Sequence, residues 1–539
     1  MPLTERAQGQ PAGDLAPLAP LAPLAPLAPA GLRLRPDPGS RLLAAATGRA
    51  GGKAPAGGAV LVGGSPVRVL RLTPAGARHV AGWWAGTPVA ASPQARGLAR
   101  RLLDTGIAHP WPDAGGWGPG DVTVVIPVRD RQAELARCLA GLSEGRPPGQ
   151  ALAELPVRMP RVIVVDDGSD DPAAIARVAA GAGARVLRRP VNGGPGAARN
   201  TGLAAVDTPL VAFLDSDCLP GPGWLDTLLP HFADPAVGAV APRIMPGEPG
   251  RTWLARYEGA SSTLDMGARA SIVRPGSRVP YVPGAALVVR RAAAGTGFTE
   301  TMRVGEDVDF VWRLAASGWR VRYEPAAAMR HQHRVRLREW FGRRKDYGTS
   351  AALLERRHPG AVRPLYISAW TALAWLAAAA GRPEAGAACT GAGIALLARR
   401  LAQVTGEPWP GARTAWLLAA RLAGGGTLAA GRPLGSAISR TWWPVALPGA
   451  LAVSRLRAPL VALVLAPPLL DWLDRRPPLD PARYIAARLL DDIGYSLGVW
   501  QGCLRQRTVR PLLPRLGGRH LDTPRVKSAG TMTSSGDRS

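Results

Sequence analysis

Three apolar runs that each end in polar residues constrain the fold of this chain more than any other feature. They read DVTVVIPV (121–128), RVIVVDDGS (161–169) and LVAFLDSD (210–217), and a helical stretch, RQAELARCLAGL, lies between the first two. Val- and Ile-rich runs without alternation are typical of strands buried on both faces of a parallel sheet. The spacing predicts a doubly wound α/β sheet, which binds its ligand beyond the carboxyl ends of its strands.

The residues at these strand ends can form a nucleotide site. Asp215 and Asp217 make a D-x-D pair, which by itself also fits an acidic turn, because Asp readily hydrogen-bonds its own backbone. At the mouth of a parallel sheet the same oxygens can hold Mg²⁺ or Mn²⁺, and the ion can carry the phosphates of a substrate. We therefore predict a metal on Asp217 and Asp215 and a donor nucleotide along this edge. The residues of the nucleotide site are Pro127, Val128, Arg129, Asp166, Asp167, Gly168, Ser169, Asp215 and Ser216.

The Gly-rich segment NGGPGAARNTGLA (192–204) has two interpretations. It matches neither the G-x-x-x-x-G-K phosphate loop nor a G-x-G-x-x-G fingerprint. It fits a flexible loop that leads into a helix. It also fits a loop whose backbone approaches the nucleotide, with Asn192 and Arg199 contacting the ligand near a helix N-terminus.

Acids and histidines further along the chain supply the remaining candidates. In GEDVDFVWRL, Glu306 and Asp307 precede a predicted helix, where they could cap its N-terminus or supply a general base for an attacking hydroxyl. His331 and His333 would share one face of a predicted strand. They could bind a metal, but phosphate binding or structural hydrogen bonding is the preferred interpretation, because no third His lies nearby.

The charge of the chain points away from nucleic acid. The formal net charge is +27, yet Lys occurs only at Lys53, Lys345 and Lys527, so the excess is Arg, as a GC-rich genome would produce. No basic patch with interleaved aromatic residues stands out, so we expect no nucleic-acid partner. An anionic membrane surface or a phosphorylated substrate is a better explanation of the positive charge than nucleic acid. The four cysteines have no C-x-x-C spacing, which fits a reducing cytoplasm.

Composition divides the chain into five parts. A Leu-Ala-Pro-rich tail is expected to be disordered, because a Pro at every third position blocks helix and central strand. Two short strands around Gly63 and Gly64, a helix from near Thr73 and a second helix predict a winged-helix-like module, which fits either a cap without a ligand or a peptide-recognition unit. The five predicted parts are the tail (1–40), the module (41–117), the α/β domain (118–350), an Ala/Leu-rich helical region (360–510) and a polar tail (511–539).

The helical region contains uncharged runs bracketed by Arg. Only the first, 364–381, approaches the roughly 18 residues that can cross a membrane; the others are 385–398, 441–454 and 458–470. Short tilted spans, interfacial helices and an ordinary helical bundle all remain open. We expect membrane association on the cytoplasmic side.

The ordered motifs VVIPV, VVDDGS, NGGPGAARN-x-G, FLDSD and GEDVDFVWRL make the segment from about Asp121 to Gly348 resemble the inverting glycosyltransferases of family 2, which have the GT-A fold. The resemblance implies that Asp166 and Asp167 contact the uracil and ribose of a UDP-sugar. It also implies that Asp215 and Asp217 contact the ribose and a metal, and that Asp307 is the catalytic base with Glu306 beside it. The Q-x-x-R-W signature of processive synthases is absent from HQHRVRLREW, so long polymers are not expected.

Over most of its length the chain is similar to the mycofactocin-system glycosyltransferase family of actinobacteria. The similarity includes VLVGGSPVRVLRLTPAGA in the module and YSLGVWQGCLRQRTVRPLLPR near the end. It implies transfer of β-1,4-linked glucose from UDP-glucose to premycofactocin, a redox cofactor derived from a ribosomal peptide, or to its peptide precursor. The Leu-Ala-Pro tail and the Ala/Gly residues at 49–58 look like insertions.

Two rival functions remain. A membrane-bound transferase that builds a cell-envelope glycan or glycolipid would keep the chemistry and change the acceptor. A non-catalytic scaffold with a vestigial transferase domain is disfavoured, because Asp215, Asp217, Glu306 and Asp307 are all present.

Overall fold

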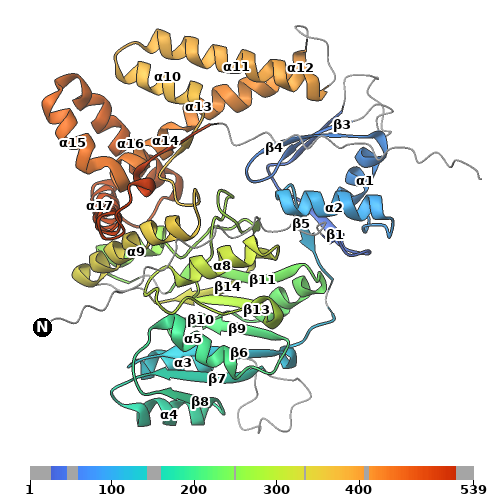
Figure 1. The fold of residues 1–539 in the computed structure, drawn as a ribbon, viewed down its shortest axis with the longest axis vertical. Coiled ribbons are helices and arrows are strands. Elements are labelled where there is room, and N and C mark those ends of the chain that lie inside the picture. The colour runs from blue at the N-terminus through green and yellow to red at the C-terminus, as the bar shows by residue number, and fades with distance from the viewer. Residues whose placement is uncertain are drawn as a thin grey trace, which may run out of the picture.

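A computed structural model shows the chain as a central α/β domain, a small N-terminal module beside it and a group of helices formed by the C-terminal part (Figure 1). The structure describes residues 26–44, 59–113, 115–142, 160–247, 250–332, 336–405 and 412–517. The predictions for residues 1–25, 49–58, His333 and 518–539 lie outside these residues.

The α/β domain is built on a nine-stranded mixed sheet. Its strands are β6 (Val122–Val128), β7 (Arg161–Asp167), β8 (Arg185–Arg189), β9 (Leu210–Leu214), β10 (Cys218–Pro220), β11 (Val237–Pro246), β12 (Ser271–Ile272), β13 (Ala286–Arg290) and β14 (Arg320–His331). Their order is β10-β14-β11-β13-β9-β6-β7-β8, and β12 pairs with β14. The predicted parallel strands are confirmed as the neighbours β9-β6-β7-β8.

The other half of the sheet departs from the expected parallel arrangement in part: β11 and β14 run parallel, but the other pairs do not. Strand β13 runs antiparallel to both β9 and β11, and β10 and β12 run antiparallel to β14. Antiparallel neighbours need no crossover helix, so this half lacks the regular strand–helix alternation from which the sheet was predicted.

The register brings the polar strand ends to one edge. Val128 lies beside Asp166, and Asp167 lies beside Arg189 on the next strand. The strand interiors are almost fully buried, and separate hydrophobic clusters cover the two faces. Burial on both faces accounts for the continuous apolar runs, and the first polar residues appear where the strands leave the core.

Helices connect these strands and cover the sheet. They are α3 (Gln132–Leu142), α4 (Pro172–Gly181), α5 (Pro195–Ala204), α6 (Trp224–Leu228), α7 (Trp253–Ser261) and α8 (Glu306–Ala316). Asp171 caps α4 by accepting a hydrogen bond from the Ala174 N–H at 2.9 Å. Helix α8 begins at Glu306 itself, so Glu306 and Asp307 form its first turn rather than preceding it.

The N-terminal module contains a three-stranded antiparallel sheet, a separate strand pair and two helices. Its elements are β1 (Arg33–Pro36), β2 (Arg41–Ala44), β3 (Ala59–Gly63), β4 (Arg68–Leu72), α1 (Pro74–Trp84), α2 (Pro93–Thr105) and β5 (Ala108–Trp111). The predicted start of α1 is confirmed: Thr73 caps it by accepting a hydrogen bond from the Gly76 N–H at 3.1 Å.

The prediction of a disordered tail over residues 1–40 is wrong for its last part. Strand β1 lies within that range and pairs antiparallel with β5. The Leu-Ala-Pro repeat ends before it, and Leu34 of β1 packs in the hydrophobic core of the module. The pairing partner is about 75 residues away in the sequence, so the local composition gave no indication of it.

Ion pairs attach the module to the α/β domain. Arg100 of α2 donates to both carboxylate oxygens of Asp234 at 2.8 Å, and Arg320 of β14 pairs with Asp104 at 2.9 Å. Both side chains of the first pair are largely buried, so breaking one partner would leave a buried charge unpaired. The module therefore sits on the α/β domain at a fixed orientation.

The C-terminal part is helical, with one short strand pair. Its elements are α9 (Leu337–Arg357), β15 (Tyr366–Ile367), α10 (Ala369–Ala379), α11 (Pro383–Thr405), α12 (Arg413–Ala419), α13 (Gly425–Ala429), α14 (Gly431–Ala437), α15 (Trp443–Ala452), α16 (Arg457–Arg475), α17 (Pro481–Arg505) and β16 (Arg515–Leu516). A π-helical turn, η6 (Ile438–Trp442), joins α14 to α15.

Several expectations for this part are corrected. The run at 364–381 forms the 11-residue helix α10, which is too short to cross a membrane, because the chain turns at Gly381. Within the described residues one segment, Ser454–Arg475, is long and apolar enough to do so. The domain boundary at residue 350 falls inside α9, and β16 lies in the region 511–539 that was predicted to be a polar tail.

Helices α11 and α12 return to the N-terminal module. Leu397, Leu401 and Leu418 share a hydrophobic cluster with Val60 of β3 and Val69 of β4. The face of the module sheet opposite α1 and α2 is thereby covered by the C-terminal helices.

Helices α9 and α17 cross at glycines. A Cβ on Gly348 would lie 2.1 Å from the Tyr495 carbonyl oxygen, and a Cβ on Gly498 would lie 1.9 Å from that of Lys345. Only hydrogen fits at this distance, so the two backbones approach more closely than any other residue would permit. The crossing fixes the C-terminal helices on the α/β domain.

We expect Gly498→Ala to destabilise the protein by about 3 kcal/mol or more, because the added methyl group overlaps backbone atoms that cannot move aside. Gly342→Ala in the same α9 helix is the matched control, since a Cβ there meets no atom within 4 Å. It should be neutral or stabilising by up to about 1 kcal/mol. Urea unfolding of both variants measures the difference, and equal midpoints would contradict close packing at the crossing.

Candidate functional site

The two acids that end β7 are held by neighbouring backbone and arginines. Asp167 accepts hydrogen bonds from the N–H groups of Gly193 and Gly194 at 2.9 and 2.8 Å and from Arg189 Nε at 2.8 Å. Asp166 accepts from the Ser169 N–H at 2.9 Å and pairs with Arg188. The Gly-rich segment therefore lies against the end of β7.

Gly168 and Asn192 form the junction between these loops. Gly168 has φ +75°, and a Cβ there would lie 2.8 Å from the Asn192 nitrogen. Asn192 turns its own loop by accepting a hydrogen bond from the Gly194 N–H at 2.9 Å. Only glycine allows both the conformation and the close approach. The predicted nucleotide residues at the end of β7 and in the Gly-rich loop are thus adjacent in space.

Arg199 joins the two acidic motifs. Its side chain is 3% exposed and extends from α5 between the end of β9 and the start of α8. Nη1 donates to Glu306 at 2.9 Å, and Nη2 donates to Asp215 at 2.7 Å and to the Gly284 carbonyl oxygen at 3.2 Å. One buried cation therefore brings Asp215 and Glu306, 91 positions apart in the chain, to the same place.

Asp307 stands at the rim of this cluster. Its Oδ2 accepts from the Gly284 N–H at 2.7 Å and its Oδ1 from the Val308 N–H at 2.8 Å. Asp307 is partly exposed, whereas Glu306 is 6% exposed and pairs with Arg199. Of the two acids, Asp307 is the one that a substrate can reach.

The electrostatics of the cluster differ between its acids. Burial, reinforced by the nearby Asp307 charge, raises the pKa of Glu306 to about 7, although Arg199 opposes the shift. Burial likewise raises the pKa of Asp215, with Asp217 adding to it and Arg199 opposing it. Both acids lie where negative charge is already concentrated, which is a common property of functional sites.

Asp217 lies in a different environment. Burial alone would raise its pKa, but His331 and Arg131 outweigh burial and hold the pKa of Asp217 well below its usual range. His331 Nε2 is 3.4 Å from Asp217 Oδ1, and Arg131 contacts Oδ2. A cavity of about 330 Å³ opens beside Asp217 and is also lined by Glu134 and Arg330.

The donor set around Asp217 fits a divalent ion in part. Asp217 and His331 offer oxygen and nitrogen ligands of the types that Mn²⁺ accepts. Ligands about 2.1–2.2 Å from an ion and 90° apart would themselves be about 3 Å apart, close to the 3.4 Å that separates this pair. The described residues contain no preformed cluster of three or more such side chains.

The remaining predicted residues also lie at this edge. Pro127 and Val128 end β6, Ser216 is buried next to Asp215, and Ser169 Oγ accepts from the Asp130 N–H at 3.0 Å. Arg129 is more exposed and pairs with Asp130. The structure thus gathers the predicted nucleotide, metal and catalytic residues along the strand ends or around Arg199. Their contacts with a ligand stay predictions.

Residues that the sequence analysis did not identify complete the site. They are Arg131, Arg188, Arg189 and Gly284. The two arginines that end β8 in ARVLRRP lie beside the two acids that end β7. Their place at the end of a predicted strand is the sequence pattern that could have identified them. Gly284 lies outside any strand end, and no local pattern marks it.

Two family models match the chain. Glycosyl transferase family 2 matches residues 123–296, and glycosyl transferase family group 2 matches residues 210–453. The pre-mycofactocin glycosyltransferase of Mycobacterium tuberculosis (strain ATCC 25618 / H37Rv) is 42% identical over 476 residues, which cover 85% of this chain and 95% of that protein. The chain belongs to the pre-mycofactocin glycosyltransferase family. The predicted GT-A fold and family 2 membership are confirmed.

Other relatives are less similar and align with a smaller part of the chain. The succinoglycan biosynthesis protein ExoU of Rhizobium meliloti (strain 1021) is 33% identical over 38% of the chain and 59% of ExoU. A solved mannosyltransferase from Pyrobaculum calidifontis, in complex with GDP-Man and Mn²⁺, is 22% identical over 60% of this chain and 91% of that one, with a TM-score of 0.34. The structural similarity is too limited to carry a further argument.

For this member of the family we expect Glu306 to make stability depend on pH. The pKa of Glu306 is raised from 4.5 to about 7 on folding, so its ionisation destabilises the folded state and stability falls as pH rises through that range. Glu306→Gln removes this loss and should gain stability relative to the wild type, on the order of 1–3 kcal/mol, between pH 5 and pH 8. Urea unfolding of the nucleotide-free protein across that range measures the gain; parallel curves for the two proteins would contradict the buried, proton-binding Glu306.

Proposed function

We propose that the chain transfers glucose from UDP-glucose to premycofactocin, or to its peptide precursor, with inversion at the anomeric carbon, and builds a β-1,4-linked glucan on it. The observation that carries the proposal is the 42% identity over 95% of a relative named pre-mycofactocin glycosyltransferase. The arrangement of acids at the strand ends supports the chemistry, because each of the required roles has a side chain in position.

The donor would lie along the carboxyl ends of β6, β7 and β9. Asp166 and Asp167 would accept hydrogen bonds from the uracil and ribose, and Arg188 and Arg189 hold these two carboxylates in place. The Gly-rich loop gives the backbone a close approach at Gly193 and Gly194, whose N–H groups already point to Asp167. Open α/β sheets bind nucleotides at such edges.

The diphosphate would lie near Asp217. Asp217, with Asp215 and His331 beside it, would hold Mg²⁺ or Mn²⁺, and the bound ion supplies positive charge for the leaving UDP. Arg131 already contacts Asp217 and brings a second positive charge to the same place.

Asp307 would act as the general base. Two backbone N–H groups fix its carboxylate at the rim of the cluster, where an acceptor hydroxyl can reach it. The raised pKa of Glu306, about 7, would also suit a base, yet its burial and its pairing with Arg199 remove it from the acceptor. Glu306 and Arg199 are therefore positioning residues. Asp307 takes the hydroxyl proton as the oxygen attacks the anomeric carbon from the face opposite UDP, so the configuration inverts.

The direct assay incubates the purified protein with UDP-glucose, Mg²⁺ or Mn²⁺ and premycofactocin, followed by mass spectrometry of the acceptor. We expect successive additions of a hexose mass. Asp307→Asn should lower turnover by about 10²–10⁴-fold with donor binding retained, because the amide keeps the shape and loses the basicity. Asp217→Ala should abolish transfer. Asp226→Asn, an exposed residue of α6, serves as the matched control; full activity of the Asp307 variant would end the base assignment.

A cell-envelope glycan or glycolipid acceptor is the second candidate function. The name of ExoU associates that relative with succinoglycan biosynthesis, and the apolar C-terminal helices would suit a lipid-linked acceptor. In the same assay, no hexose on premycofactocin but UDP release on addition of membrane lipids would favour this alternative.

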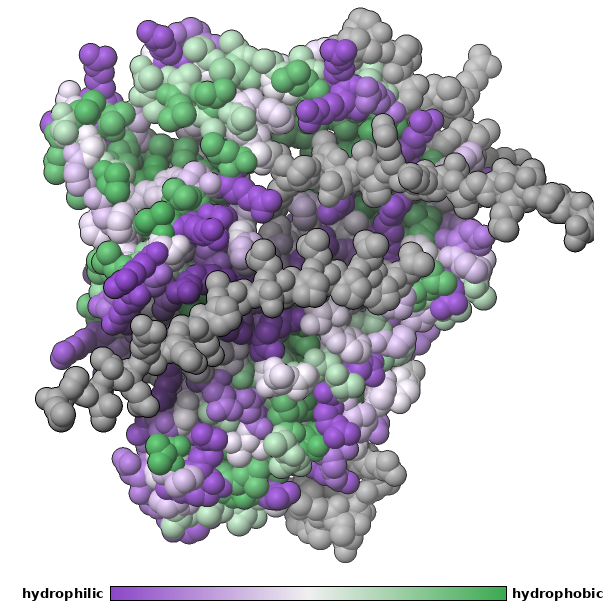
Figure 2. Space-filling view, in the orientation of Figure 1, coloured by the Kyte–Doolittle hydropathy of each residue, from purple (hydrophilic) through white to green (hydrophobic). Residues whose placement is uncertain are grey.

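We further propose that the protein associates with the cytoplasmic side of the membrane through α10, α15 and α16. Hydrophobic residues gather on the surface over α10 and α15 (Figure 2), where Leu376 and Leu451 are 66% and 65% exposed. Helix α16 packs its Pro467 and Pro468 face against the protein and leaves Val461, Leu465 and Leu469 exposed. Arginines flank this surface and would meet anionic headgroups; they are Arg455, Arg457, Arg475 and Arg476.

Flotation with vesicles that contain anionic lipid tests the association. The wild type should float, and added salt should weaken its binding, because the arginine contribution is screened. The double variant Leu447→Glu and Leu451→Glu places two charges on the surface and should remain unbound. Val67→Glu, at an exposed apolar residue of the N-terminal module, is the control and should float like the wild type. A wild type that stays in solution would overturn the proposal.

A further inference from the structure

A second cavity lies between the α/β domain and the C-terminal helices. Its volume is about 230 Å³, below the 300–1,000 Å³ typical of sites for drug-sized ligands, so it suits a smaller group. Tyr257, Ser262 and Tyr281 line it from the α/β domain, and Arg440, Arg488 and Asp491 line it from η6 and α17.

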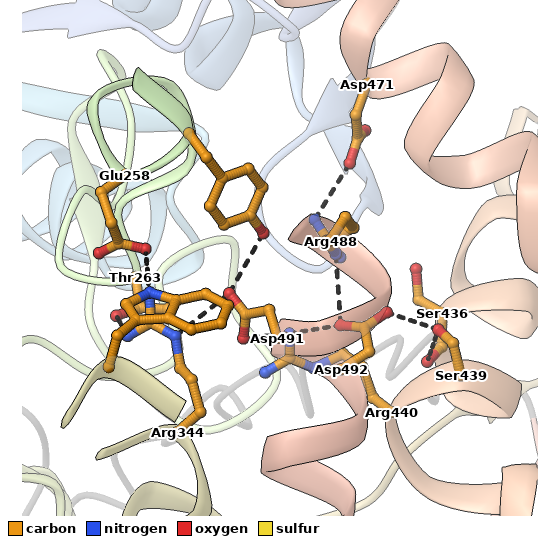
Figure 3. Close-up of polar contacts among 12 residues, drawn as sticks. Glu258, Thr263, Arg344, Ser436, Ser439, Arg440, Asp471, Arg488, Asp491 and Asp492 are labelled. Atoms are coloured by element: carbon orange, nitrogen blue, oxygen red, sulfur yellow. Dashed lines mark hydrogen bonds and ion pairs between the residues drawn. The ribbon is translucent and has the colours of Figure 1, made fainter. Parts of the chain in front are cut away.

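The wall formed by the helices is held rigidly by ion pairs (Figure 3). Asp492 accepts hydrogen bonds from Arg440 at 2.9 Å, from Arg488 at 3.2 Å and from Ser439 at 2.6 Å. Asp471 accepts a further hydrogen bond from Arg488 at 3.2 Å. Arg440 and Arg488, two of the three arginines that line the cavity, thus have their charges compensated by Asp492 and Asp471. The third, Arg475, donates to the Ala260 carbonyl oxygen at 2.6 Å.

Asp491 is fixed in the same way from the other side. Its Oδ2 accepts a hydrogen bond from the Tyr257 hydroxyl at 3.2 Å and lies 3.2 Å from Arg344 Nε, and Arg344 pairs with Glu258 (Figure 3). Side chains anchored on helices in this manner can hold a ligand without reorganising first.

One buried carboxylate oxygen of the cavity lining lacks a hydrogen-bond partner among the described residues. Asp491 Oδ1 accepts no hydrogen bond, although Asp491 is 2% exposed, and the nearest Arg440 nitrogen is 3.9 Å away. A buried carboxylate oxygen without a donor is costly. A ligand hydroxyl can both donate to Asp491 and accept from Tyr281.

The backbone connects this cavity to the catalytic base. Tyr281 lines the cavity, and Gly284, three residues further on, donates its N–H to Asp307. Three residues span at most about 10 Å, so a group in the cavity lies within one or two sugar rings of the base. The Asp307 charge is also among the causes that raise the pKa of Tyr281, after burial and the nearby Tyr495.

We propose that this cavity is an acceptor subsite that binds the sugar unit already attached to the acceptor, and that it thereby permits further glucose units to be added. The inference rests on the proposed function. The lining offers hydrogen-bond donors, acceptors and tyrosine rings, several of them held in place by ion pairs, and these match the hydroxyls and faces of a hexose. The subsite combines the α/β domain with α17, so the C-terminal helices contribute directly to acceptor recognition.

The experiment follows hexose additions to premycofactocin over time by mass spectrometry, using the full chain with UDP-glucose and metal. Tyr281→Phe removes one hydroxyl and should lower the rate of the second addition relative to the first by about 3–10-fold. Ser262→Trp fills the cavity and should stop the reaction after one hexose. Tyr366→Phe is the matched control: its hydroxyl bonds to the Gly360 carbonyl oxygen in another part of the fold, and the ratio should equal that of the wild type.

The outcomes separate the two proposals. No hexose addition by the wild type would overturn the proposed function and this subsite with it. Transfer by the wild type, with an unchanged ratio of second to first additions in both variants, would overturn the subsite alone. Cellobiose, a β-1,4-linked glucose disaccharide, provides a direct binding test: calorimetry should detect it with the wild type and not with Ser262→Trp, and equal binding to both would contradict the assignment.

Discussion

The buried guanidinium of Arg199 is the interaction on which the rest of the site depends. It joins the end of β9 to the start of α8 and to the loop at Gly284 through Asp215, Glu306 and one carbonyl oxygen. Without it, the buried carboxylate of Glu306 would lose the cation that pairs with it, and the partly exposed Asp215 would lose its contact with the same guanidinium. The same three segments carry the proposed metal ligands and the proposed base, so one side chain aligns the two halves of the catalytic machinery.

The C-terminal helices are held firmly against the α/β domain, and in the proposed acceptor subsite they would contribute to the site. Glycines at the α9–α17 crossing bring α17 close to the α/β domain. The pairs Arg344–Asp491, Arg440–Asp492 and Arg488–Asp471 fix its orientation. The helices also carry the exposed apolar surface. A protein bound to lipid through that surface would hold its cleft at a constant distance from the bilayer.

Much of the site was predictable because its residues directly follow buried strands, and buried strands are recognisable in the sequence as continuous apolar runs. Asp166, Asp167 and Asp215 appear where apolar runs stop, and parallel strands bring such positions together. Glu306 and Asp307 were identified by their place at a helix start. Contacts such as Arg199 with Glu306, His331 with Asp217 and Tyr281 with α17 depend on tertiary packing between distant segments, and no periodicity records them. For the same reason β1, which pairs with a strand far along the chain, was mistaken for part of the tail.

Helices α11 and α12, from the C-terminal part of the chain, pack against β3 and β4 of the N-terminal module. The apolar face of the module sheet leaves the ribosome roughly 340 residues before the helices that cover it, an interval of about 20–70 s at 5–20 residues per second. During that time the α/β domain can fold alone, while the first part of the chain presents an uncovered sheet. A nascent chain of this architecture is therefore a natural client for chaperones until its last third has been synthesised.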